Sequence, residues 1–189
     1  MGKSYTQDNL GIYGYGSLLK DAGEKIEPRV IDRIPISSPW PIEYARRSNL
    51  WGGGPTLALH QTGGKVQGQI LVLSVQSDAL SHVREWLRER EGNPPLAWIK
   101  EMELGGFNRV LYCDLEPTLS EADIKPDSLA RFTIESVRIK PDKNGIRYLR
   151  QNIEQTVITP LTYAYRDAIL LQCGAKNLHE AEKLLLETK

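Results

Sequence analysis

The sequence has few of the side chains that metal and redox sites require. Only two cysteines and three histidines occur among its 189 residues, and none of them share a ligand spacing. Cys113 and Cys173 are therefore expected to be reduced thiols, and the histidines are expected to have structural or surface roles. The sequence predicts neither a bound metal nor a cofactor.

The sequence also lacks an excess of either charge. Its 24 Lys and Arg residues balance 24 Asp and Glu residues, which argues against nucleic acid or an anionic membrane as a partner. The longest apolar run, residues 70–73, is too short to span a bilayer. No apolar segment follows the first six residues, as a signal peptide would require. We therefore expect a cytoplasmic protein, while its oligomeric state stays open.

The chain length suits one domain with a substantial core, and no linker or repeat divides it. We therefore predict a single domain over residues 8–189. Short segments rich in β-branched and aromatic residues predict strands. These strands are expected at residues 11–16, 42–45, 56–60, 66–73, 97–104, 107–114 and 131–139. The turn-forming residues between the third and fourth strands predict a hairpin over residues 56–73.

The remaining segments are expected to be irregular or helical. Four prolines make residues 28–50 irregular apart from one short strand, and residues 117–130 are a polar loop. A helix is expected to begin at Ser77 or Asp78 and to run to about Glu91. Closing helices are expected over residues 146–189.

The order of these elements predicts an α+β fold. Strands come first, one helix follows, and further strands precede the closing helices. This order favours a mostly antiparallel, barrel-like β-sheet with flanking helices. Regular βαβ alternation is missing, which disfavours a Rossmann fold.

Glu91 stands where helical spacing expects an apolar residue. Leu80, Val83 and Leu87 form the apolar stripe, and Glu91 follows Leu87 by one turn. Partial burial and the negative end of the helix dipole would both raise the pKa of this carboxyl towards the range of a general base. The alternative is a frayed helix end with Glu91 in water.

The segment around Gly16 is a strand that breaks into a glycine-containing loop. A dinucleotide fingerprint would need a third glycine where Leu19 stands, so that interpretation fails. Ser17 and Lys20 match a Ser-x-x-Lys hydrolase motif, but its companion motifs are absent. The third interpretation is a cradle of backbone N–H groups for an anion or oxyanion.

Four short motifs in one order resemble the γ-glutamylcyclotransferase-like family. They are Tyr-Gly-Ser-Leu at residues 15–18, a glycine turn into a strand at residues 53–57, Val-x-Gly and apolar residues at 66–71, and Glu-x-Glu-Gly at 89–92. The resemblance covers about residues 11–104. It implies a γ-glutamylcyclotransferase-like fold and a small γ-glutamyl substrate.

The resemblance also implies a reaction. Members of this family cleave a γ-glutamyl amide by turning the substrate's own amine on its side-chain carbonyl, which releases 5-oxoproline. Glu91 would be the catalytic acid/base, and the backbone of Tyr15, Gly16, Ser17 and Leu18 would bind the substrate. No metal or cofactor is needed. The leaving group stays open between an amino acid, an amine and glutathione.

Five further residues are candidates for substrate binding on the same resemblance. Gly53 and Gly54 would allow the backbone to approach the site closely. Trp98 stands where the family has a tyrosine, and it lacks the hydroxyl group. A late tyrosine lines the site in relatives, and Tyr148 and Tyr165 both match. The alternative function is a non-catalytic small-molecule-binding or interaction protein that retains the fold and the pocket.

Overall fold

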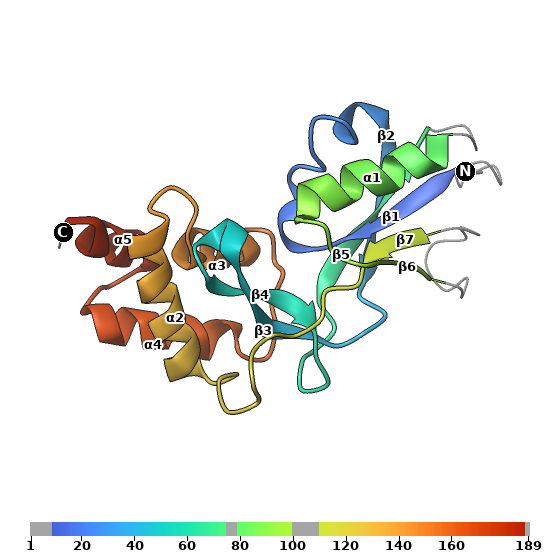
Figure 1. Cartoon of the computed structure of the whole chain (residues 1–189). Helices are drawn as coiled ribbons and strands as arrows, with labels where there is room; N and C mark the ends of the chain where they lie inside the picture. Colours follow the sequence, from blue (N-terminus) through green and yellow to red (C-terminus); the bar gives the residue numbers. More distant parts are fainter. Residues whose placement is uncertain (1–8, 75–78, 100–109, 188–189) are drawn as a thin grey trace. The chain divides into compact units, whose positions relative to one another are not determined.

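The computed structural model describes residues 9–74, 79–99 and 110–187 (Figure 1). These residues form two units: the first contains the described parts of Met1–Ser38 and Gln67–Leu115, and the second contains those of Pro39–Val66 and Glu116–Lys189. The predicted caps of the first helix, Ser77 and Asp78, lie outside the described residues. Among the described helices, none has the length and apolar character needed to cross a membrane.

A five-stranded sheet is the framework of the first unit. Its strand order is β2-β5-β1-β7-β6, and every neighbouring pair is antiparallel except β1 with β7. The strands are β1 (Leu10–Gly14), β2 (Val30–Ser37), β5 (Gln67–Leu73), β6 (Leu96–Ile99) and β7 (Val110–Cys113). The prediction of a mostly antiparallel sheet in an α+β fold is confirmed.

Helix α1 (Leu80–Glu91) covers one face of this sheet (Figure 1). Ile12 is paired with Leu71 on one side and with Leu111 on the other, so their side chains share that face. Val83 and Leu87 of α1 are fully buried against it. Full burial of such a side chain stabilises the fold by about 1.5–3 kcal/mol, so this contact fixes the position of α1 on the sheet.

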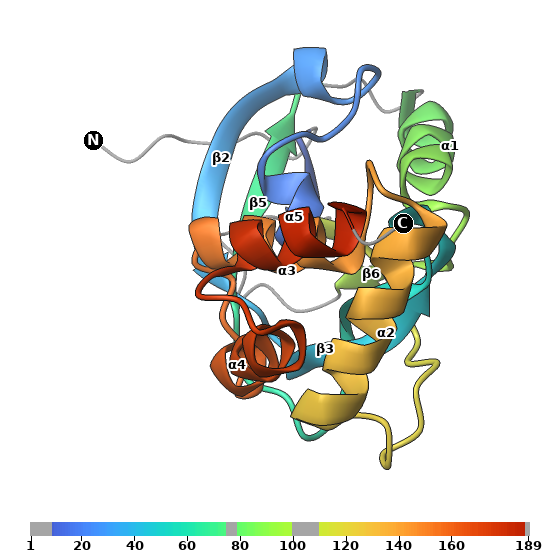
Figure 2. The ribbon, with the colours of Figure 1, turned by 90° about the vertical axis from the view of Figure 1, so that its left-hand side faces the viewer.

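The second unit combines a two-stranded ribbon with four helices. Strands β3 (Ile42–Ser48) and β4 (Gly54–Leu59) are antiparallel. The helices are α2 (Pro126–Ile139), α3 (Gly145–Glu154), α4 (Thr162–Cys173) and α5 (Leu178–Glu187). Helix α2 packs on β4 and on the other three helices (Figure 2). The predicted closing helices are confirmed, and they are interrupted near Pro160 and Gly174.

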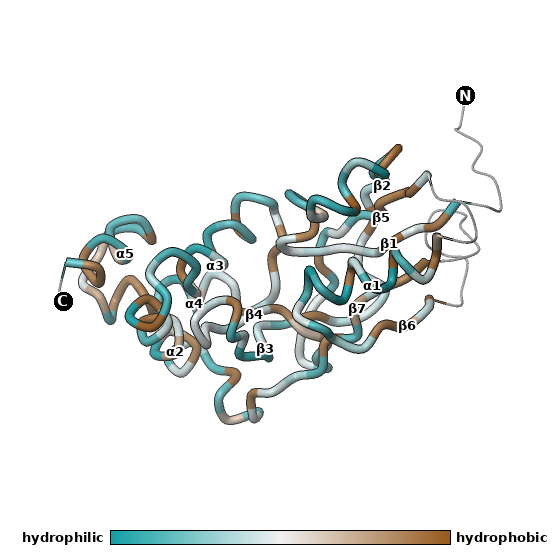
Figure 3. Tube along the Cα trace, turned by 45° about the horizontal axis from the view of Figure 1, so that its top comes forward, coloured by the Kyte–Doolittle hydropathy of each residue, from teal (hydrophilic) through white to brown (hydrophobic). Residues whose placement is uncertain are grey.

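The prediction of a strand over residues 131–139 is wrong, because these residues lie in α2. Their β-branched side chains have high strand propensity, but tertiary packing overrides it. Thr133, Ser136 and Val137 are buried at helical spacing, and hydrophilic and hydrophobic stretches alternate along α2 (Figure 3). Pro126 in the first turn suits a helix start, so the predicted loop over residues 117–130 is shorter than expected.

The prediction that residues 28–50 are largely irregular is also wrong. Strand β2 occupies Val30–Ser37, and β3 continues from Ile42 to Ser48. Pro35 is tolerated because β2 is an edge strand with only β5 beside it, and an edge strand has one side without ladder hydrogen bonds. Pro35 therefore indicates an edge strand of the sheet and does not interrupt that strand.

The predicted hairpin over residues 56–73 does not form. Strand β4 pairs with β3, whereas β5 pairs with β1 and β2. The Gly63 N–H closes a turn by donating to the His60 carbonyl at 2.9 Å, but the chain after this turn pairs with β3 through Gly64. Gly64 exchanges two backbone hydrogen bonds with Ile42, of 2.9 and 3.2 Å. A Cβ atom on Gly63 would lie 2.3 Å from the Ile42 carbonyl oxygen, so this contact requires glycine.

Candidate active site

Helix α1 ends at Glu91 because Gly92 adopts the left-handed conformation. The φ angle of Gly92 is 81°, and the N–H groups of Gly92 and Asn93 both donate to the Arg88 carbonyl. Glu91 stays on the side of the buried Leu87, and its side chain is only 14% exposed. The carboxylate therefore lies in a largely enclosed position and not at a frayed end in water.

The loop of residues 15–18 turns sharply after β1. Tyr15 is still extended, and Gly16, with a φ angle of 59°, begins a short 3₁₀-helix over Gly16–Leu19. Such a φ angle favours glycine. Leu18 is 5% exposed and belongs to the core beneath α1. A Cβ atom on Gly14 would lie 2.9 Å from the Leu18 Cβ atom, so glycine lets this turn close over the core.

The segment after this loop is held in place by Glu27 and Arg33. Arg33 donates to the Leu19 carbonyl at 3.3 Å and to the Glu27 carboxylate at 2.5 Å. The Ala22 N–H also donates to Glu27, at 2.9 Å. The bonds from Arg33 and Ala22 lower the pKa of the Glu27 carboxyl. The backbone between the loop and β2 is therefore fixed beside the end of α1.

Arg90 joins this loop to Glu91. Its Nη1 atom donates to the Ser17 hydroxyl at 3.1 Å and also to the Glu91 carboxylate. Its Nη2 atom donates to the Asp21 carbonyl at 2.5 Å. The Arg90 side chain is 19% exposed. One guanidinium group thus brings together the two halves of the predicted site, which are far apart in the sequence.

This arrangement has two chemical consequences. The guanidinium stabilises the charged form of Glu91, so it opposes the two effects expected to raise the pKa of this carboxyl. That rise stays a prediction. The Ser17 hydroxyl accepts a hydrogen bond from an arginine, which cannot act as its base, while Lys20 is exposed. The described contacts therefore give the serine hydrolase hypothesis no support.

Trp98 lies in β6 opposite Leu111 and packs against the same core as α1. The guanidinium carbon of Arg84, on α1, lies 5.9 Å from the centre of the Trp98 ring system. An aromatic ring at this position therefore has a packing role, and its predicted contact with a substrate stays a prediction.

Gly53 and Gly54 lie in the second unit, where the protein's own backbone accounts for both. Gly53 has a φ angle of 80°, and its carbonyl accepts a 2.7 Å hydrogen bond from Arg47. A Cβ atom on Gly54 would lie 2.8 Å from the Cα atom of Gly145 in α3. The close approach predicted for these glycines is thus made to α3, and a role in ligand binding stays a prediction.

Tyr148 and Tyr165 also lie in the second unit, and both are buried. The Tyr148 hydroxyl accepts a 3.2 Å hydrogen bond from the N–H of Leu57. Tyr165 is fully buried, its hydroxyl is bonded to Thr133, and burial raises the pKa of its phenol. Both hydroxyl groups have protein partners, and the choice between the two as a ligand contact stays open.

Arg90 is the residue that the sequence argument missed. It occupies the variable position of the Glu-x-Glu-Gly motif, and the sequence alone gave it no role. Consecutive helical residues do not normally face each other, so periodicity gave no sign of its contact with Glu91. Within the described residues, no group of three or more His, Cys, Asp or Glu side chains could hold a metal.

Comparison with known proteins identifies the fold of this chain. No protein-family model matches the sequence, and no curated protein matches it significantly. A solved structure does match, a γ-glutamyl cyclotransferase specific to glutathione from yeast, with a TM-score of 0.50 and 15% sequence identity. The match covers 86% of this chain and 96% of that chain. The chain has a γ-glutamylcyclotransferase-like fold.

The γ-glutamylcyclotransferase-like fold agrees with the family that the four short motifs indicated. At 15% sequence identity the match shows a shared fold, but it does not identify the substrate of this protein. The function therefore has to be argued from the residues at the site.

Proposed function

We propose that this protein is a γ-glutamyl cyclotransferase that releases 5-oxoproline from a small γ-glutamyl amino acid or amine. The observation that carries the proposal is the contact of one guanidinium with both Ser17 and Glu91. It brings an enclosed carboxylate next to a loop of backbone donors, which are the two groups that this reaction requires. The γ-glutamylcyclotransferase-like fold supports the same assignment.

The reaction needs one carboxylate and no nucleophile from the protein. The α-ammonium of the substrate gives one proton to Glu91, and the resulting amine attacks its own γ-carbonyl carbon and passes a second proton to the departing nitrogen. A new C–N bond closes the five-membered ring, and the amide C–N bond to the leaving group breaks. Glu91 returns the proton to the departing nitrogen. The products are 5-oxoproline and an amine, and the carboxylate is regenerated.

The loop supplies binding and charge stabilisation in this proposal. In this proposal the backbone N–H groups of Tyr15, Gly16, Ser17 and Leu18, where β1 turns into the short 3₁₀-helix, bind the substrate. Such donors stabilise the oxyanion that develops on the γ-carbonyl oxygen. In this proposal Trp98 contacts the substrate with its apolar ring. The family has a tyrosine at this position, so the hydrogen bond that a tyrosine hydroxyl could make to the substrate is missing.

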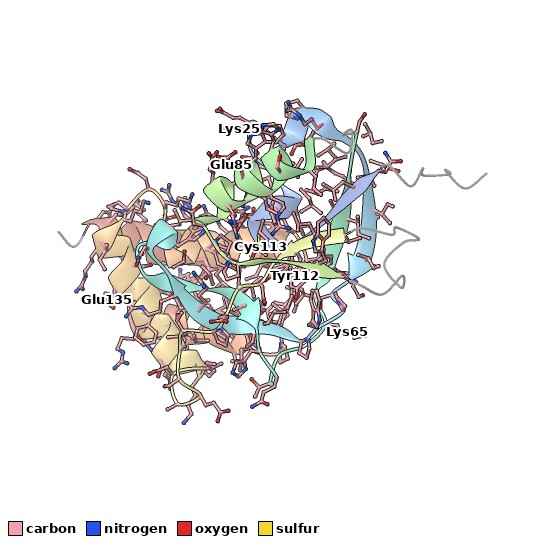
Figure 4. All side chains as sticks on the ribbon, turned by 45° about the vertical axis from the view of Figure 1, so that its right-hand side comes forward. Lys25, Lys65, Glu85, Tyr112, Cys113 and Glu135 are labelled. Atoms are coloured by element: carbon pink, nitrogen blue, oxygen red, sulfur yellow. The ribbon has the colours of Figure 1, made fainter. Side chains whose placement is uncertain are left out.

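The test is release of 5-oxoproline from a γ-glutamyl amino acid, a γ-glutamyl amine and glutathione. Glu91→Gln is expected to lower kcat by about 10²–10⁴-fold, as loss of a general acid/base does. Glu89→Gln is the matched control, because Glu89 is on the same helix but 51% exposed and paired with Lys25. Lys25 and Glu85 lie at the outside of this helix (Figure 4). Unchanged release by Glu91→Gln would refute the assignment.

A non-catalytic binding protein is the second candidate, and the contact between Arg90 and Glu91 favours it. A carboxylate held by a guanidinium is a weak base. The two candidates differ in the same assay. A binding protein releases no 5-oxoproline from any of the three substrates, yet it retains 5-oxoproline in equilibrium dialysis.

A further inference from the structure

We propose that Arg90 is the carboxylate receptor of this site, and that a ligand carboxylate replaces Glu91 on its guanidinium. This exchange frees Glu91 to take the proton from the ligand's amine. The inference deepens the proposed function and rests on it. In the free protein, the contact with Arg90 makes Glu91 a weaker base. When the ligand carboxylate replaces Glu91 on the guanidinium, Glu91 becomes available to accept a proton.

The guanidinium of Arg90 is held from several sides. The φ angle of Gly23 is 92°, and a Cβ atom there would lie 3.2 Å from the Cγ atom of Arg90, so the backbone packs against the arginine stem. The Asp21 carbonyl holds Nη2, and the Ser17 hydroxyl contacts Nη1. These neutral contacts fix the group in place. They leave its charge to be balanced by a carboxylate.

Glu91 now provides that carboxylate, and another can replace it. The carboxylate of Asp21 is engaged with the N–H of Gly23 at 2.7 Å. A planar guanidinium binds a carboxylate through two parallel hydrogen bonds, a geometry open to a free ligand. The end of α1 disfavours negative charge on Glu91, so protonation of Glu91 after the exchange removes an unfavourable charge from the helix end.

The exchange couples binding to proton transfer. In the free protein the guanidinium favours the ionised form of Glu91. Once a ligand carboxylate has taken its place, Glu91 loses this stabilisation and becomes the stronger base. The α-ammonium of a γ-glutamyl group is bonded to the same carbon as the α-carboxylate, so the carboxylate that displaces Glu91 brings the proton donor with it. The proton then moves from nitrogen to a Glu91 oxygen.

The exchange defines a substrate class. A ligand must carry a carboxylate next to its reacting amine, as γ-glutamyl amino acids and γ-glutamyl amines do. Arg90 is bonded to Ser17, Asp21 and Glu91 of the first unit, and its charge partly offsets the burial that raises the pKa of the Cys113 thiol on β7. A neutral analogue offers the guanidinium no carboxylate, so it is not expected to displace Glu91. A γ-glutamyl analogue with an α-carboxamide is therefore excluded.

The experiment is a carboxyl-carbon NMR titration of the full chain labelled with ¹³C-glutamate. Glu91→Gln identifies the signal of Glu91. The probes are 5-oxoproline and 5-oxoprolinamide, which differ in one carboxylate. Saturating 5-oxoproline is expected to raise the pKa of Glu91 by about one unit or more, the usual effect of losing a nearby opposite charge. In Arg90→Met the pKa is already high, and 5-oxoproline leaves it unchanged.

Two control variants distinguish carboxylate exchange on Arg90 from a purely structural role of this residue. Arg90→Lys retains a charge and is expected to recover part of the shift, which a purely structural role would not predict. Arg88→Met removes an exposed arginine of the same helix and is expected to behave like the wild type. Equal shifts with both probes, or no shift with 5-oxoproline, would overturn the inference. No turnover is needed, so failure of the exchange is distinguishable from failure of the proposed reaction, which the release assay measures.

Discussion

Ser17 and Glu91 meet at a single atom, the Nη1 nitrogen of Arg90. The serine comes from the turn that follows β1, and the glutamate ends α1. The core that packs α1 on the sheet places both ends of this contact, because Leu18 and Leu87 belong to the same cluster. The proposed site therefore depends on the packing of the first unit.

Ser17→Ala tests whether the hydroxyl positions Arg90. Removal of a hydrogen bond to a charged group costs about 1.5–3 kcal/mol when the groups are buried, and this one is partly exposed. We expect KM for a γ-glutamyl substrate to rise about ten-fold, with kcat changed much less. Steady-state release of 5-oxoproline measures both constants.

Ser17→Thr is the control, since it retains a hydroxyl at the same position and is expected to keep most of the affinity. If Ser17 were a nucleophile, Ser17→Ala would abolish kcat and leave KM nearly unchanged. That outcome would contradict the role of the hydroxyl as a support for Arg90.

The buried carboxyl group of Glu43 is expected to make the free energy of unfolding fall as pH rises. Its carboxylate is fully buried and accepts hydrogen bonds from Thr159, Tyr44 and Leu161. Burial raises the pKa of this carboxyl despite those bonds. A folded pKa above the unfolded value gives stability that is present at low pH and is lost as pH rises through the folded pKa, about 1.4 kcal/mol per unit of difference.

The measurement is urea unfolding of the wild type and Glu43→Gln at pH 4 and pH 7.5. The free energy of unfolding of the variant, relative to the wild type, is expected to be higher at pH 7.5 than at pH 4. Thr159→Val removes a bond that favours the charged form, so it should steepen the pH dependence. A difference between wild type and Glu43→Gln that does not vary with pH would disprove the assignment.

Local signals predicted the elements that carry the site. Gly92 is enough to end a helix after Glu91, and Gly16 is enough to turn the chain after β1. Both depend on the conformational freedom of one residue, which can be read from the sequence. The breaks between the closing helices coincide with Pro160 and Gly174, residue types that commonly end or interrupt a helix.

Tertiary contacts account for what the sequence did not predict. The β-branched residues of α2 are helical because tertiary packing buries them: Thr133 is bonded to Tyr165 in α4, and α2 packs on β4, contacts that no local rule contains. Gly63 and Gly64 have the composition of a hairpin turn, yet their partner is Ile42 in β3. Arginine usually faces solvent in a helix. Arg90 lies at the site instead because it contacts Ser17 and Asp21, which are remote in the sequence.

Gly54→Ala should destabilise the second unit more than Gly174→Ala does. At Gly54 the added methyl group would lie 2.8 Å from the Cα atom of Gly145, so backbone must move. We expect a loss of about 2–3 kcal/mol in the free energy of unfolding. At Gly174 no atom lies within 4 Å of the added group, and only its φ angle of 64° opposes alanine, at about 1 kcal/mol.

Urea unfolding of the two variants in parallel gives this comparison. If Gly53 and Gly54 served ligand binding alone, Gly54→Ala would lower affinity for 5-oxoproline without a loss of stability. Equal unfolding free energies for the two variants would count against the close contact with α3.

The two cysteines should react at different rates because they differ in burial. Cys113 and Tyr112 are neighbours in β7 (Figure 4), and Cys113 is 6% exposed in the core under α1. Burial raises the pKa of its thiol to about 12, so roughly one molecule in ten thousand carries the reactive thiolate at pH 8. Cys173, at the end of α4, is only partly buried.

We therefore expect iodoacetamide at pH 8 to modify Cys173 in the native protein and to leave Cys113 unmodified, with both modified in urea. Peptide mass spectrometry over a time course measures the two rates. Since Cys113 packs with Leu87 and Leu18 in one cluster, its modification reports opening of the core that places Ser17 and Glu91. Destabilising variants of the first unit should accelerate the reaction at Cys113, whereas Gly54→Ala should leave that rate unchanged. Equal native rates at the two thiols would show that this core does not protect the site.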